Sequence, residues 1–279
     1  MSAKKSATLP CVQWGKYRIS RLCVGHNPLK GQSHLNRTLD EEMAQWYDPQ
    51  HGRDLELLRL CENAGINTVQ FGGDKMHALL HRYKEQGGRL QWISTLYDPD
   101  NGDFDAELKR IIAVDPKPIG IQYYAGTGDR EYLLGRMNGV RDKVKKIRDS
   151  GVLTGVGTHL PEVVDFIENQ HWDVDFYQTC FYTVYVKKSL GVIDRDNETF
   201  ENDDRTRMAK VVKQASKPCI AFKVLGATRN CAADKDVEAA FKFAYDNIKE
   251  SDVVLVGMWQ KYKDQVSQNA KIVRRLLSK

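Results

Sequence analysis

Short runs of apolar, β-branched and aromatic residues alternate with longer amphipathic stretches along most of the chain. The short runs predict buried strands, because a strand covered on both faces reads as a continuous apolar segment. The predicted strands span residues 21–27, 68–72, 91–97, 119–125, 155–159, 175–181, 219–225 and 252–258. A stretch with helical periodicity follows each of them. The predicted helices span residues 55–64, 75–85, 104–114, 130–150, 161–169, 204–215, 234–249 and 261–277.

Eight strand–helix units in 279 residues match the size and order of a closed α/β barrel. We therefore predict an α/β fold of the (βα)8 TIM barrel type, forming a single domain over residues 1–279. A doubly wound open sheet is the alternative, but it needs a Gly-x-Gly-x-x-Gly turn after its first strand, which residues 24–31 lack. Two long connections, 28–54 and 182–203, are predicted to lie over the C-terminal face, where barrel enzymes carry their active sites.

Composition and charge exclude several classes of protein. Hydrophobic residues make up 41% of the chain, but no apolar run is long enough to cross a bilayer, so no membrane partner is expected. The net charge of +5 is spread along the chain and is too dilute to indicate a nucleic-acid partner. Residues 1–10 lack the apolar core of a secretory signal, which favours a cytoplasmic location. A small molecule is therefore the expected partner, and the oligomeric state is not predicted.

Four segments carry a resemblance to a known family: Ile19–Gly25, Glu62–Thr68, Gly151–His159 and Val254–Met258. Together they resemble the aldo-keto reductases, in the expected order and over nearly the whole chain. The resemblance implies an NADPH-dependent carbonyl reductase built on this barrel. It also implies that the adenosine end of the cofactor lies near the last strand and helix. The matching positions here are Gly257, Lys263, Gln265 and Asn269.

The resemblance further implies a catalytic aspartate, tyrosine, lysine and histidine, and all four positions are substituted. Gln70 stands at the aspartate position, and no tyrosine follows it at the expected distance. Leu96 stands at the lysine position and Ala125 at the histidine position. Loss of the tyrosine removes a general acid, a contribution commonly worth about 10²–10⁴ in rate. NADP therefore remains a candidate cofactor rather than an assigned one.

Lys223 is the sharpest candidate for the missing chemistry. It lies in the apolar run 219–225, where burial is expected to lower the pKa of its amine and suit it to act as a base or a Schiff-base nucleophile. The carboxylates that follow strands, Asp74 and Asp98, are expected far around the barrel from it. The structural alternative is an ion pair or a lysine that reaches to the rim.

Further candidates lie at the predicted C-terminal ends of strands. His26, His159, Tyr97 and Tyr124 are predicted acids or bases, with a satisfied rim histidine or a packed aromatic ring as the alternative. His34 is close to His26 in sequence, and with His159 these residues would bring three imidazoles, a possible set of metal ligands, to the barrel mouth. Their spacing matches no ligand signature, and no metal is expected.

Asn27, Gln70 and Gln178 are predicted to bind a hydroxyl-rich substrate such as a sugar or polyol, because a buried amide needs partners at both ends. A polar layer bonded between strands is the alternative for the two glutamines.

Three functions remain open at this point. The first is an oxidoreductase of the aldo-keto reductase type that acts on a small carbonyl, sugar or polyol without the usual tetrad. The second is a non-redox lyase or isomerase of sugar-like substrates that uses Lys223 with a histidine. The third is a ligand-binding protein without catalytic activity.

Overall fold

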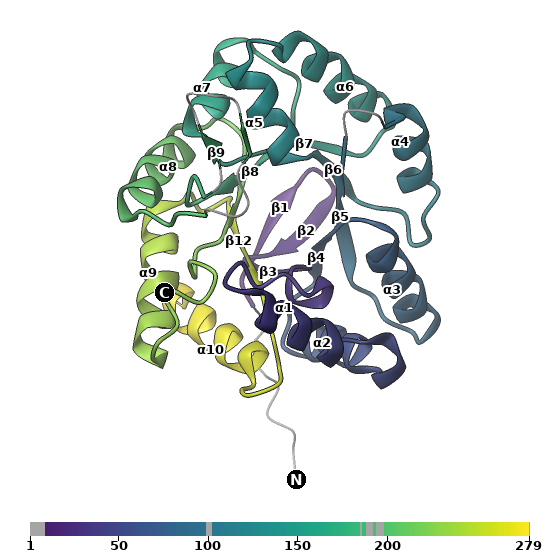
Figure 1. The fold of residues 1–279 in the computed structure, drawn as a ribbon, viewed down its shortest axis with the longest axis vertical. Coiled ribbons are helices and arrows are strands. Elements are labelled where there is room, and N and C mark those ends of the chain that lie inside the picture. Colours follow the sequence, from purple (N-terminus) through teal and green to yellow (C-terminus); the bar gives the residue numbers. More distant parts are fainter. Residues whose placement is uncertain (1–8, 99–101, 185, 188–191, 194–197, 279) are drawn as a thin grey trace.

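The computed structural model describes residues 9–98, 102–184, 186–187, 192–193 and 198–278. Eight parallel strands close into a barrel in the order β11-β12-β3-β4-β5-β6-β7-β8, with helices around the outside (Figure 1). This confirms the predicted α/β barrel. The barrel strands are β3 (Leu22–Gly25), β4 (Thr68–Phe71), β5 (Gln91–Leu96), β6 (Gly120–Tyr123), β7 (Leu153–Thr158), β8 (Phe176–Cys180), β11 (Cys219–Phe222) and β12 (Val253–Gly257).

The outer layer consists of the helices that connect these strands. It comprises α2 (Arg53–Asn63), α3 (Asp74–Glu85), α4 (Phe104–Ile112), α5 (Ala125–Leu133), α6 (Met137–Asp149), α7 (Pro161–Asn169), α8 (Asn202–Gln214), α9 (Asp234–Asn247) and α10 (Gln265–Leu277). The predicted helix 130–150 is wrong in one respect, because it is two helices. Gly135 separates α5 from α6 with a φ of 70°, a left-handed conformation that glycine adopts without strain.

The long connection after β3 is more ordered than the sequence analysis predicted. It contains the helix α1 (Arg37–Trp46) and the single turns η1 (Pro28–Lys30) and η2 (Pro49–His51). Asn36 caps α1 by accepting a hydrogen bond from the backbone N–H of Leu39 at 2.9 Å. The second long connection contains the short antiparallel pair β9 (Val186–Lys187) and β10 (Val192–Ile193). Residues 185, 188–191 and 194–197 of the predicted loop 182–203 lie outside the described residues.

An N-terminal hairpin, which the sequence analysis did not predict, closes the amino end of the barrel. Its strands are β1 (Cys11–Trp14) and β2 (Tyr17–Ser20), and it crosses the barrel opening in Figure 1. The side chain of Gln91, at the start of β5, donates a hydrogen bond to the carbonyl of Arg18 at 2.7 Å. The ring of Trp14 stacks on Phe176 with the ring centroids 5.5 Å apart. This end of the barrel is therefore filled by apolar side chains, and a cavity has room only at the carboxyl end.

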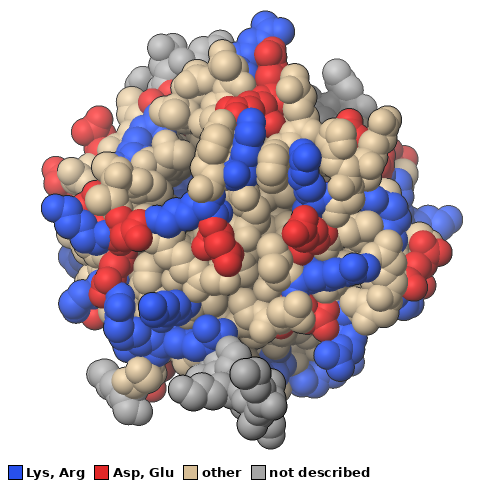
Figure 2. All heavy atoms as spheres, turned by 90° about the horizontal axis from the view of Figure 1, so that it is seen from below, with Lys and Arg blue, Asp and Glu red and all other residues tan. Residues whose placement is uncertain are grey.

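Charged residues of both signs are interspersed on the face of the molecule drawn in Figure 2. Ion pairs also join neighbouring helices, as between Arg275 of α10 and Glu238 of α9. Among the described residues, no helix has both the length and the apolar character needed to span a membrane.

Candidate active site

A cavity of about 1040 Å³ opens at the carboxyl ends of the barrel strands. All twelve residues that the sequence analysis singled out for the site line it, although their roles remain predictions. They are His26, Asn27, Gln70, Tyr97, Tyr124, His159, Gln178, Lys223, Gly257, Lys263, Gln265 and Asn269. The barrel brings them together because residues at the ends of parallel strands project over one opening.

Five of these residues come directly after a strand, and four of the five follow alternate strands. His26, Tyr97, His159 and Lys223 are each the first residue after a strand, namely β3, β5, β7 and β11. These strands alternate around the barrel, and side chains from alternate strands form a layer in this fold. The four reactive groups therefore surround the same opening.

Lys223 carries a buried amine without a hydrogen-bond partner among the described residues. Its backbone has a φ of 57°, in the left-handed region that residues with a side chain rarely adopt. Burial lowers the pKa of the Lys223 amine, and the thiol of Cys180 and the carboxylate of Glu198 oppose this effect. Glu198, in the loop after β8, also lies close to Lys223, and the sequence analysis did not name it.

His159 is held by a buried aspartate. Its Nδ1 lies 2.8 Å from Oδ2 of Asp129, which also accepts the backbone N–H of His159 at 2.9 Å. The hydroxyl of Thr158 donates to the other carboxylate oxygen. Asp129 is 0% exposed, so this carboxylate fixes the imidazole with its Nδ1–H toward α5. Such a pair orients a histidine for proton transfer through Nε2.

Asp129 is a functional candidate that the sequence analysis missed. It lies 30 residues before His159, in the first half of α5. Nothing in the local pattern distinguishes it from a surface aspartate. The available signal was its position soon after the end of a predicted strand, since helix starts on this face of a barrel lie beside the active site.

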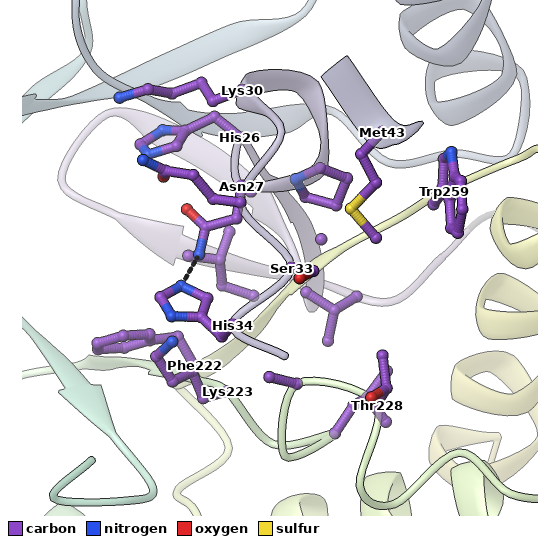
Figure 3. A pocket seen from close by; sticks show the side chains of 18 of the residues that line it. His26, Asn27, Lys30, Ser33, His34, Met43, Phe222, Lys223, Thr228 and Trp259 are labelled. Carbon is purple, nitrogen blue, oxygen red and sulfur yellow. Dashed lines mark hydrogen bonds between the residues drawn. The ribbon is translucent and has the colours of Figure 1, made fainter. Parts of the chain in front are cut away.

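His34 links the two long connections above the cavity. Its Nδ1 lies 2.8 Å from Glu198 Oε1 and its Nε2 lies 2.9 Å from Nδ2 of Asn27, the arrangement of a neutral ring protonated on Nδ1. Burial lowers the pKa of His34, and the hydrogen bond to Glu198 opposes this shift. A positive charge on Lys223 or on His159 would lower it further, so both residues lie near His34, and Figure 3 shows His34 between Asn27 and Lys223.

Tyr97 occupies a second cluster in the same cavity. Its hydroxyl lies 3.4 Å from Nζ of Lys30 and 3.4 Å from Nε2 of His26. Burial, together with the charge of Lys30, lowers the pKa of His26 to about 3. The ring of Tyr124 packs against that of Tyr97 with the centroids 4.9 Å apart. A tyrosine, a lysine and a histidine thus meet here, although they come from other positions than those the resemblance implied.

Amide side chains form the floor of the cavity. Gln70 on β4 and Gln122 on β6 both donate through Nε2 to the hydroxyl of Thr95 on β5. Gln178 lies on β8, and Gln122 is a floor residue that the sequence analysis did not name. The polar layer that was predicted as the alternative for Gln70 is therefore present.

The four positions expected to hold a nicotinamide cofactor are largely engaged by the protein. Lys263 pairs with Asp234, and Gln265 Oε1 accepts the backbone N–H of Trp259 at 2.8 Å. Asn269 is buried. Gly257 is exposed, and a Cβ placed there would meet the ring of Pro28. Lys263 and Gln265 are therefore engaged by the protein, while the fit of the four positions to the adenosine end of the cofactor remains a prediction.

Within the part of the chain that the structure describes, no group of three or more His, Cys, Asp or Glu side chains has a metal-binding arrangement.

Comparisons with known proteins place the fold in context. No family model matches the chain, and no curated protein does. A glycerol dehydrogenase from Gluconobacter oxydans has a similar structure, with a TM-score of 0.55 and 12% identity over 99% of this chain and 98% of the other. An aldo/keto reductase from Brucella melitensis gives a TM-score of 0.55 and 11% identity, with 96% and 100% covered.

A third similar structure comes from another class of enzyme. An archaeal fructose-1,6-bisphosphate aldolase gives a TM-score of 0.50 and 14% identity, with 92% of each chain covered. At these identities the likeness shows the TIM-barrel fold, which the chain shares with aldo-keto reductases and aldolases alike.

Proposed function

We propose that this protein is an enzyme that acts on a small carbonyl compound by forming a Schiff base with Lys223. One observation carries the proposal: the Nζ atom of Lys223 is buried in the cavity without a hydrogen-bond partner among the described residues. Burial of this kind favours the neutral amine, which is the nucleophilic form. A structural lysine in the same place would be paired.

The proposed step is a condensation in which atoms and charge balance. The lone pair of the Lys223 amine forms a bond to the carbonyl carbon as the C=O π bond breaks. The nitrogen then gives up one proton and the oxygen takes one up, which gives a neutral carbinolamine. Loss of that oxygen as water then leaves the imine, which becomes an iminium ion on protonation. The iminium ion accepts the electron pair of a neighbouring C–H or C–C bond when that bond breaks.

His159 is proposed as the group that moves these protons. Asp129 holds its Nδ1–H, which leaves Nε2 as the basic nitrogen of the neutral ring. The ring of His159 lies 5.6 Å, centroid to centroid, from the ring of Phe222, the residue before Lys223.

A Schiff base that accepts the electron pair of a broken C–H or C–C bond serves a lyase or an isomerase, so the proposed reaction neither oxidises nor reduces the substrate overall. The archaeal aldolase, whose catalytic lysine is described as bound to a carbinolamine intermediate, shows only that this fold accommodates such a step.

Borohydride trapping tests the proposal. The protein is incubated with dihydroxyacetone, glyceraldehyde, pyruvate or glycolaldehyde, reduced with borohydride and mapped by mass spectrometry. We expect the mass of the reduced adduct on Lys223, and none on the exposed Lys210 of α8. The Lys223→Met variant should lose the adduct. Equal labelling of Lys223 and Lys210 across the panel would contradict the proposal.

Carbonyl reduction is the second candidate, because the Tyr97 hydroxyl lies 3.4 Å from both Lys30 and His26. This cluster would supply the acid that the substituted tetrad lacks, and it would keep the protein functionally related to the aldo-keto reductases. NADPH binding through Lys263 would require this side chain to leave Asp234. Titration with NADPH, followed by quenching of tryptophan fluorescence, separates the two candidates, since the Schiff-base enzyme should show no saturable quenching.

A further inference from the structure

Two acceptor atoms on the cavity floor have no donor. The side-chain oxygens Oε1 of Gln122 and Gln178 are buried without a hydrogen-bond partner among the described residues. The side chains are 1% and 5% exposed, respectively, and both line the cavity. A buried amide oxygen without a donor is unfavourable, so its retention indicates that a ligand supplies the donor.

The backbone of β7 places these two acceptors near one another. Gln122 pairs in register with Gly155, and Gln178 pairs in register with Gly157. A Cβ added at Gly157 would collide with Oε1 of Gln122, so this oxygen lies over the residue that is paired with Gln178. The missing side chain of Gly157 therefore opens the floor between the two glutamines.

The charges around the cavity select the kind of donor. Lys30, Arg37 and Arg229 line it together with Asp40 and Glu198. Positive side chains therefore outnumber carboxylates even when Lys223 is neutral, which disfavours an ammonium group in the same space. The acceptors are also neutral amides rather than carboxylates. A neutral O–H donor fits both observations better than a charged N–H donor.

We infer that Gln122 and Gln178 form a subsite for two hydroxyl groups of a polyhydroxylated carbonyl substrate, whose carbonyl carbon reaches Lys223. This inference rests on the proposed function for the role of Lys223, but the hydroxyl subsite itself is tested without it. Gln178 is then a specificity-determining residue, and Gln122 is a second one that also bonds to Thr95.

Ligand-observed NMR with a compound that lacks a carbonyl tests the subsite directly. Saturation-transfer titrations compare xylitol with 1,5-pentanediol, which lacks the three inner hydroxyl groups. We expect xylitol to bind more tightly, and Gln178→Leu to weaken it about fivefold for one lost hydrogen bond. Thr179→Val is the matched control, because Thr179 is buried on the same strand and does not line the cavity. Equal binding of the two compounds, or unchanged xylitol binding by Gln178→Leu, would overturn the inference.

The outcomes separate this inference from the proposed function. Xylitol binding that depends on Gln178 and persists in Lys223→Met, together with no borohydride adduct, would support the subsite and reject the Schiff base. An adduct on Lys223 that forms equally with glyceraldehyde and with propionaldehyde would support the Schiff base and reject the hydroxyl subsite. Thermal unfolding of Gln178→Leu and of the unbranched Gln178→Met checks that both variants fold. We expect no loss of stability, because each removes a buried oxygen without a partner.

Discussion

His26 should make the protein sensitive to acid, and the size of this effect follows from its burial. The side chain is 7% exposed, its Nε2 contacts the Tyr97 hydroxyl, and its ring lies 6.3 Å from that of Phe71. Burial and the Lys30 charge lower its pKa to about 3 in the folded protein. In the unfolded chain the pKa returns to about 6.5. As pH falls below about 6.5, protons bind the unfolded state preferentially, and stability is lost.

The magnitude can be worked out from these two pKa values. At pH 4.5 the unfolded-state histidine is protonated and the folded-state histidine is still neutral. The two pH units between 6.5 and 4.5 correspond to about 3 kcal/mol of unfolding free energy. The unfolding free energy of a typical domain is about 5–15 kcal/mol in total. The protonation of this one side chain would therefore remove a large share of the stability at acid pH.

Urea unfolding of the wild type and of His26→Phe, at pH 7 and at pH 4.5, measures this contribution. Phenylalanine keeps a ring of similar shape but cannot bind a proton. All other titrating groups, including His34, are common to both proteins, so the difference between the two pH-dependent losses isolates His26. We expect the wild type to lose about 3 kcal/mol more than the variant. Equal losses would show that His26 is not held neutral by its surroundings, and the reasoning from burial would be refuted.

Three further predictions concern the barrel and the candidate site. Lys223→Met should keep the unfolding free energy within about 1–2 kcal/mol in urea titrations, because methionine retains the apolar stem; a structural ion pair would lose about 3–5 kcal/mol. Asp129→Asn should slow adduct formation on Lys223 at least tenfold in timed borohydride quenches, since it alters the tautomer of His159. Gly155→Ala should lower stability by about 1–3 kcal/mol or more, because its Cβ would overlap the Phe176 ring. Gly139→Ala on α6, where the space around the residue is open, is the control. Thermal unfolding of both variants should show a loss of stability for Gly155→Ala and none for Gly139→Ala.

The barrel could be predicted because its strands are covered on both faces. Each barrel strand is a short apolar run, and the eight runs in the sequence correspond to the eight strands. The N-terminal hairpin was missed because Gln13, Lys16 and Arg18 interrupt residues 11–20, so that this segment contains no continuous apolar run. The hairpin closes the amino end of the barrel through contacts with residues distant in sequence, such as Phe176 and Gln91.

The site could be predicted only in part, for a related reason. Residues at strand ends are identifiable once the strands are known, so the cavity positions of His159 and Lys223 could be predicted, while their roles remain predictions. Their partners lie on other elements, as Asp129 does on α5 and Glu198 in the loop after β8. Those contacts join residues far apart in the chain, and no local pattern encodes them.

The positions that the resemblance marks as a substituted tetrad and the candidate residues of the cavity lie at different heights along the barrel strands. The substituted positions Gln70 and Leu96 lie within strands β4 and β5, whereas His26, Tyr97, His159 and Lys223 each lie one residue beyond a strand. Gln70 now bonds to Thr95 in the floor, one level below the Tyr97 hydroxyl with its Lys30 and His26 neighbours. Under the proposed function, this polar floor lies beneath a ring of titratable groups, and the reaction takes place nearer to the long connections. His34 and Glu198 come from those connections, so a substrate held at Lys223 would contact loop residues as well as strand residues, and changes in the loops would alter its specificity without disturbing the barrel.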